Sequence, residues 1–154
     1  MKTLLAAIFL TVALLDAAHA QSPAALKPPI GVPADAVPFN GRWYRVYLEK
    51  CGCLRARASC SALGGQLASV SDEPTHIFIQ QLAKGLTLWL GATDEKTEGA
   101  WVWPNGKEMT FKAWAPGENL DNRQENFLVI REGLWYDYSK TGIGAGFICE
   151  WHAK

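Results

Sequence analysis

The chain has 154 residues, of which 49% are apolar and 19% are charged. This length suits one ordinary domain with short extensions, and the apolar content is enough for a buried core, which excludes a disordered or collagen-like chain. Basic and acidic residues balance at 15 each, and the basic ones form neither a run nor an aromatic-basic stripe. The composition therefore argues against nucleic acid as a partner.

The first twenty residues have the three parts of a secretory signal peptide. Lys2 supplies a short positive region, residues 3–15 form an apolar run, and Ala18-His19-Ala20 gives a small-x-small cleavage pattern. The run is shorter than the roughly 20 apolar residues that a bilayer span needs. We expect cleavage after residue 20, a secreted or periplasmic protein, no membrane span in the mature chain, and a compartment in which disulfides form.

The next segment, residues 21–38, contains five prolines and several alanines. This composition favours an extended, poorly packed linker. The pattern changes at Phe39, after which aromatic and β-branched residues alternate as they do in a strand. We expect the folded domain to comprise residues 39–154.

Two helices are predicted after this opening strand. Residues 55–63 are rich in helix formers and end at a Gly-Gly pair. A second helix begins after a cap at Ser71 or Asp72, with an apolar face made by Ile77, Phe78 and Leu82. Short strands are predicted at 86–92, 127–130, 134–138 and 147–151, with a turn at Pro104-Asn105-Gly106. Because strands and helices do not alternate, the fold class is α+β.

Four segments, in this order, resemble the C-type lectin family. Residues 56–70 (ARASCSALGGQLASV) resemble its first helix and the GGxLASV segment that follows. WLG at 89–91 resembles its WIG strand, TDEKTEGAWVW at 93–103 its TDxxxEGxWxW stretch, and FICEW at 147–151 its closing FxCE strand. The resemblance covers residues 41–151 and implies a C-type-lectin-like fold, with two helices flanking short antiparallel sheets and long loops.

The cysteines divide into two pairs. The resemblance implies a disulfide between Cys60 and Cys149, whereas the family's second bridge is missing and Phe127 occupies one of its positions. Cys51-Gly52-Cys53 has no counterpart in the family. A local disulfide, two spare thiols, a redox pair, an intermolecular bridge and a metal clip all remain open, although no second cysteine pair or histidine cluster accompanies a clip.

Seven tryptophans in a small domain need a shared core. Trp89, Trp101 and Trp103 fall on short predicted strands, where alternation turns side chains inward. We expect these three residues to pack in the core and not to stack on sugars.

An acidic stretch between residues 118 and 137 has the chemistry of a calcium site, because Ca²⁺ needs several oxygen ligands from flexible loops. By resemblance, Glu118, Glu125 and Asp137 match carboxylates of the family's sugar-binding calcium site. Leu120 and Tyr136 replace two of its amide ligands, and Asn119 is left for the amide role. Leu120 offers no oxygen and Tyr136 only a weakly coordinating phenol.

A second, auxiliary calcium site of the family is matched by Asp94, Glu98, Asp121 and Asn126. The alternative is that Asp94 and Glu98 only hydrogen-bond turn amides. The predicted ligand-binding residues are thus Glu118, Asn119, Glu125 and Asp137. The predicted calcium ligands are Asp94, Glu98, Glu118, Asp121, Glu125, Asn126 and Asp137.

The sequence predicts a binding module and not an enzyme. His76 and His152 stand without a positioned nucleophile or a catalytic motif, and a thiol-redox role for Cys51 and Cys53 is the only enzyme-like variant. The expected ligand is a carbohydrate or glycoconjugate, with Ca²⁺ as candidate cofactor. The alternative is a protein–protein or surface-adhesion module with the same fold and no functional sugar site.

Overall fold

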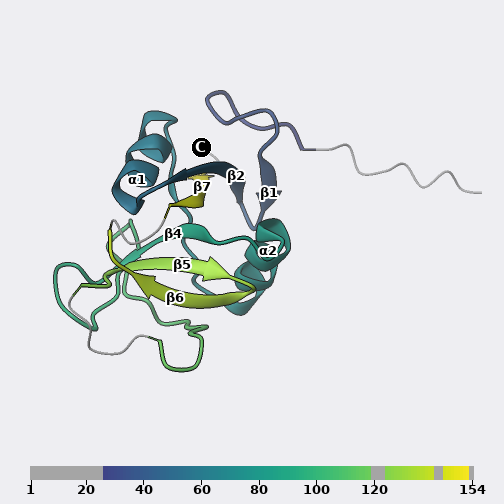
Figure 1. Ribbon diagram of the computed structural model, residues 1–154. Helices are drawn as coiled ribbons and strands as arrows, with labels where there is room; N and C mark the ends of the chain where they lie inside the picture. The colour runs from purple at the N-terminus through teal and green to yellow at the C-terminus, as the bar shows by residue number, and fades with distance from the viewer. Residues whose placement is uncertain (1–25, 119–123, 141–143, 153–154) are drawn as a thin grey trace, which may run out of the picture.

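The computed structural model describes residues 26–118, 124–140 and 144–152. Within these residues, two helices and seven strands follow one another (Figure 1). They are β1 (Val37–Phe39), β2 (Arg42–Cys51), α1 (Cys53–Ala62), β3 (Gln66–Leu67), α2 (Glu73–Ala83), β4 (Leu88–Thr93), β5 (Phe127–Arg131), β6 (Leu134–Tyr138) and β7 (Ala145–His152). Strands and helices do not alternate regularly, and the fold class is α+β, as the sequence predicts.

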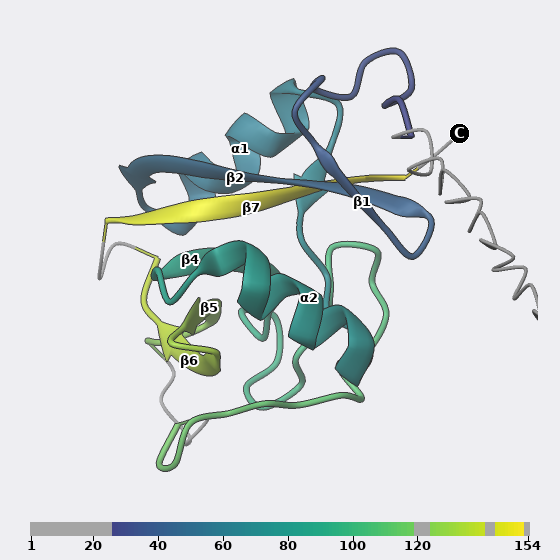
Figure 2. The same cartoon turned by 90° about the vertical axis from the view of Figure 1, so that its right-hand side faces the viewer.

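The strands form one connected sheet in the order β1-β2-β7-β4-β5-β6, and β3 also pairs with β7. The pairs are antiparallel except β4 with β7, which is parallel. Figure 2 shows α1 on one side of the long β2–β7 ribbon and α2 on the other, next to β4. The predicted arrangement of flanking helices is confirmed, and the parallel pair is an addition to the expected antiparallel sheets.

The packed structure begins before Phe39. Val37 pairs with Tyr44, and the β1–β2 turn at Asn40-Gly41 has φ values of 47° and 76°, as a tight hairpin turn requires. Ala36 is buried. The later part of the expected linker therefore belongs to the domain, since pairing with β2 overrides the local preference of a proline-rich segment. Residues 1–25 lie outside the described part of the chain, so the signal peptide and its cleavage stay predictions.

Both helices are found where the sequence predicts them. Helix α1 starts two residues earlier than expected, and α2 begins after Asp72, whose carboxylate accepts a hydrogen bond from the Thr75 amide at 2.8 Å. The expected apolar face of α2 is wrong at Ile77, which is 46% exposed, whereas Ile79 is fully buried. The buried stripe follows residues 75, 76, 79 and 83, the spacing of one helix face.

The turn and strand predictions after Gly85 are confirmed with small shifts of boundary. The Gly106 amide donates to the Trp103 carbonyl at 2.8 Å, which closes the predicted turn. Trp89, Trp101 and Trp103 are buried, as expected of core residues. No helix in the described residues combines the length and apolar character of a bilayer span.

A disulfide joins Cys60 of α1 to Cys149 of β7, with their Cα atoms 5.5 Å apart. This confirms the predicted bridge between the two ends of the domain. Phe127, at a position of the missing second bridge, is buried among apolar side chains. Hydrophobic packing replaces a covalent link at that point.

Candidate functional site

The long connection between β4 and β5 returns to the sheet beside β6. Trp135 of β6 donates its amide to the Ala113 carbonyl and accepts at its own carbonyl from the Ala115 amide, both at 2.9 Å. A turn then follows, in which the Glu118 amide donates to the Ala115 carbonyl at 3.1 Å. This backbone pairing brings Glu118 next to the carboxyl end of β6.

Glu118 and Asp137 meet through their side chains. Burial raises the pKa of Glu118, and the hydrogen bond to Asp137 and the charges of Asp137 and Glu125 raise it further. Two carboxyl groups share a hydrogen bond only when one of them holds a proton. The pair therefore favours either a proton or a cation between the two groups.

Asp94 lies just beyond the end of β4 and is 3% exposed. Its Oδ2 accepts from the Gly99 amide at 2.9 Å, and its backbone carbonyl accepts from the Thr97 amide at 2.9 Å. The alternative role for this residue, bonding to turn amides, is therefore realised. Its Oδ1 is buried and has no hydrogen-bond partner within the described residues. Burial, with a smaller contribution from the charge of Asp137, raises the pKa of Asp94.

Some of the predicted site residues lie close together in the structure, and others lie apart or outside the described part of the chain. The structure brings together Glu118 and Asp137, with Glu125 close enough to act on Glu118 by its charge. Asn126 follows Glu125, and its backbone carbonyl accepts a hydrogen bond from the Thr93 hydroxyl at 2.7 Å. Glu98 is half-buried in the turn after Asp94. Asn119 and Asp121 lie outside the described residues.

The donor set suits a hard cation but is incomplete in the described residues. Carboxylate and amide oxygens are the ligands that Ca²⁺ prefers, and the buried Asp94 Oδ1 is one such oxygen. Across residues 26–118, 124–140 and 144–152, no three or more His, Cys, Asp or Glu side chains gather closely enough to hold a metal ion. A full coordination shell would need further oxygen ligands.

Tyr136 does not join this cluster. Its ring lies beneath the Arg131 guanidinium, 4.0 Å from the ring centroid, and successive residues of a strand point to opposite faces. Asp137 shares its face with Trp135, whereas Tyr136 faces the other way. The phenol that stands in place of the family's amide is thus directed away from Asp137.

Cys51 and Cys53 are free thiols and both are buried. No local disulfide forms between them. Burial raises the pKa of Cys53 to about 12 and also raises that of Cys51. Because the thiolate is the reactive form, these two groups lack the property that a redox pair needs.

The histidines serve structure. His76 lies between Phe111 and Trp135, with ring centroids 5.5 and 5.6 Å away, and burial lowers its pKa. His152 is exposed at the end of β7, 4.0 Å from the Glu150 carboxylate. Neither residue has the setting of a general base.

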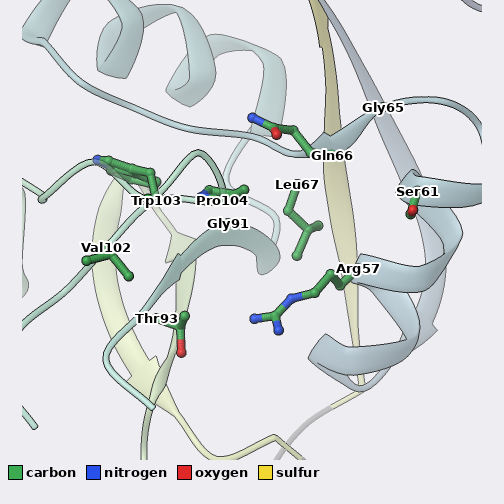
Figure 3. Close-up of a pocket in the computed structure, with 11 residues that line it drawn as sticks. Arg57, Ser61, Gly65, Gln66, Leu67, Gly91, Thr93, Val102, Trp103 and Pro104 are labelled. Carbon is green, nitrogen blue, oxygen red and sulfur yellow. The ribbon is translucent and has the colours of Figure 1, made fainter. Parts of the chain in front are cut away.

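Sequence reasoning missed a pocket of about 550 Å³ that lies next to α1 and is lined in part by Arg57 (Figure 3). Its lining comes from α1, β3, β4 and the turn after Val102, which are separated along the chain. The signal available in the sequence was Arg57 itself, a cation on a predicted helix, but its surroundings depend on the fold.

Comparisons with known proteins agree with this fold. The sequence model of the family described as "Lectin C-type domain" matches residues 50–151. The C-type lectin lectoxin-Lio3 of Erythrolamprus poecilogyrus is 30% identical over 133 residues, which are 79% of this chain and 82% of that protein. A type-2 ice-structuring protein of Hemitripterus americanus is 35% identical over 94 residues, 60% of this chain and 56% of that protein.

Solved structures give the same result. The C-type carbohydrate-recognition domain of cow CD23 superimposes with a TM-score of 0.75 at 25% identity, covering 80% of this chain and 97% of the other. Herring type II antifreeze protein gives a TM-score of 0.74 at 23% identity, covering 80% and 100%. Lectins and antifreeze proteins thus share this fold. On this evidence the chain belongs to the C-type lectin domain family, whose members are binding proteins and not enzymes.

Proposed function

We propose that this protein is an exported carbohydrate-binding module whose site is the carboxylate cluster of Glu118, Glu125 and Asp137, assisted by Ca²⁺. The observation that carries the proposal is the contact between the Glu118 and Asp137 side chains. Like charges this close are unfavourable unless a proton or a cation lies with them. Ca²⁺ is the cation that these oxygen donors suit.

Glu118, Glu125 and Asp137 would hold the ion, together with Asn119 from the segment outside the described residues, and the three carboxylates would have to draw closer than they lie in the structure. When bound, Ca²⁺ supplies positive charge and free coordination positions that sugar hydroxyls take. The chain's own carboxylates orient those hydroxyls by accepting their hydrogen bonds. Asp94, Glu98, Asp121 and Asn126 form the proposed auxiliary site, in which the buried Asp94 Oδ1 would gain a partner.

The names of similar proteins indicate that this fold serves carbohydrate recognition in some proteins and antifreeze activity in others. The cow CD23 domain was solved in the presence of a GlcNAc2Man3 oligosaccharide. Other similar structures are a calcium-independent and a Ca²⁺-dependent type II antifreeze protein. For location, we favour secretion over the periplasm, because the relatives named come from animals.

Retention on immobilised sugars tests the proposal. The mature chain should bind at least one sugar resin in calcium and elute with EDTA, and Glu118→Gln should abolish retention. Gln keeps the size of Glu118 and its ability to donate to Asp137 but removes one ligand charge. Glu108→Gln, an exposed acid elsewhere in the same long connection, is the matched control and should bind normally.

The second candidate is a protein–protein or surface-adhesion module with no functional sugar site. The direction of Tyr136, away from Asp137, favours it, because one ligand position of the family's site is then lost. A wild-type chain that no sugar resin retains, with or without calcium, would establish this alternative and refute the carbohydrate proposal.

A further inference from the structure

The pocket beside α1 is formed by elements that take no part in the carboxylate cluster. Arg57 and Ser61 come from α1, Gln66 and Leu67 from β3, and Gly91 from β4 (Figure 3). Arg57 and Ser61 are four residues apart, so they share one face of the helix. The volume, about 550 Å³, lies within the range of small-molecule sites, roughly 300–1,000 Å³.

Arg57 is the cation of this pocket, and its side chain is exposed. Arg42, Arg45 and Arg55 each form an ion pair, with N–O distances of 3.1, 2.8 and 2.8 Å. Arg57 makes no ion pair with any described residue and lies over the Phe127 ring, 5.7 Å from its centroid. In Figure 3 its guanidinium extends below Leu67 toward Thr93. An exposed guanidinium that makes no ion pair within the described residues is a ready donor to a carboxylate.

Part of the pocket wall is closely packed. Leu67 and Trp103 are almost fully buried, and Pro104 packs directly on Gly91. A Cβ atom at Gly91 would lie 2.5 Å from Pro104 Cγ and 2.7 Å from the Leu67 carbonyl oxygen. The chain can approach this closely only at glycine, so a larger residue at position 91 would displace Pro104 or the Leu67 backbone.

Hydroxyl and amide groups complete the lining. Ser61 contributes a hydroxyl and Gln66 its amide oxygen, beside the exposed ring of Pro104. The Gln66 Nε2 donates to Glu150, and the Thr93 hydroxyl donates to the Asn126 carbonyl. This combination of one cation, neutral hydrogen-bonding groups and apolar surface suits a molecule that carries one carboxylate, several hydroxyls and a C–H face.

We infer that this pocket binds a hydroxylated carboxylate of monosaccharide size, a sugar acid, through Arg57 and without calcium. The site is separate from the proposed calcium cluster, and its chemistry does not depend on that cluster. The carboxylate would take two hydrogen bonds from the guanidinium, and the ring hydroxyls would reach the Ser61 hydroxyl and the Gln66 amide oxygen, which is left free because the Gln66 Nε2 donates to Glu150.

The test uses galacturonate and galactose, which differ in whether C6 carries a carboxylate. Both are titrated in EDTA into the ¹⁵N-labelled mature chain, and the amide resonances of Leu67, Gly91 and Val102 are followed by NMR. We expect saturable shifts with galacturonate and none with galactose. EDTA keeps the outcome independent of the calcium site.

Three variants make the test specific. Arg57→Gln should weaken galacturonate binding by about tenfold or more, because it removes the charged hydrogen-bonding partner of the carboxylate. Arg55→Gln removes the same charge from the same helix but not from the pocket, and it should bind within about twofold of wild type. Ser61→Phe keeps Arg57 and should block the pocket by size. Each variant is first checked for a wild-type-like spectrum.

Three results would overturn the inference. They are an absence of saturable shifts at the pocket amides in wild type, equal binding of galactose, and an equal loss of affinity in Arg55→Gln and Arg57→Gln. The last would show attraction to general positive charge and not a built site.

Discussion

At the scale of single residues, the contact between Glu118 and Asp137 dominates the chemistry of the protein. The sequence supplies both carboxylates but not their distance, because Glu118 reaches Asp137 only through the backbone pairing of residues 113–115 with Trp135. Burial and the proximity of Asp137 raise the pKa of Glu118 and so favour its protonated form over what a free carboxyl group would show.

This pair predicts a pH dependence of stability in calcium-free buffer. Because the folded state holds the Glu118 proton more tightly than the unfolded chain, the contribution of Glu118 is most favourable at acidic pH. It is lost as the pH rises through the raised pKa. Glu118→Gln should therefore stabilise the calcium-free protein at neutral pH relative to wild type and leave it little changed in acid.

Urea unfolding of both proteins in EDTA over a series of pH values measures this difference. Glu108→Gln should follow the wild-type curve. A constant difference between wild type and Glu118→Gln at all pH values would contradict the assigned cause of the shift.

At the scale of elements, some features of the fold are determined by short-range sequence and others by long-range packing. The Asp72 cap, the Gly106 turn and the strand at 134–138 were predictable because short-range sequence determines them. The buried face of α2 was not, since Ile77 and Ile79 are equally apolar and only the docking of the helix decides between them. The parallel pairing of β4 with β7 is likewise a long-range feature.

Helix α2 offers a matched pair of substitutions. Ile79→Ala should reduce the free energy of unfolding by about 2–5 kcal/mol, because it removes a fully buried side chain from the main core. Ile77→Ala, at a half-exposed position, should change it by no more than about 0.5 kcal/mol. Denaturant unfolding of the two variants checks the orientation of the helix, and a larger loss for Ile77→Ala would show that it is wrong.

At the scale of the whole molecule, the Cys60–Cys149 disulfide joins residues 89 positions apart and closes the domain. Restricting so long a loop in the unfolded chain should contribute about 4 kcal/mol. The double variant Cys60→Ala/Cys149→Ala should lose about that much stability, and Cys51→Ala should lose far less. Chemical unfolding in non-reducing buffer measures both, and an unchanged midpoint for the double variant would contradict the structural role of the bridge.

The family and its fold could be predicted from sequence because their motifs are spread from residue 56 to residue 151 and each is locally recognisable. The ligand sites could be predicted only in part. Glu118, Glu125 and Asp137 come from the family pattern, but the turning of Tyr136 onto Arg131 and the unpaired Arg57 depend on tertiary packing. Asn119 and Asp121 remain predicted ligands.

Thermal melting during a calcium titration measures whether the carboxylate cluster binds Ca²⁺ in the folded protein. A ligand that binds only the native state raises the midpoint as its concentration increases. We predict such a rise for wild type at neutral pH, a smaller rise in Asp137→Asn, in which only the proposed auxiliary site remains, and an unchanged rise in Glu108→Gln. A wild-type midpoint that calcium leaves unchanged, or an equal rise in Asp137→Asn, would contradict calcium binding by this cluster.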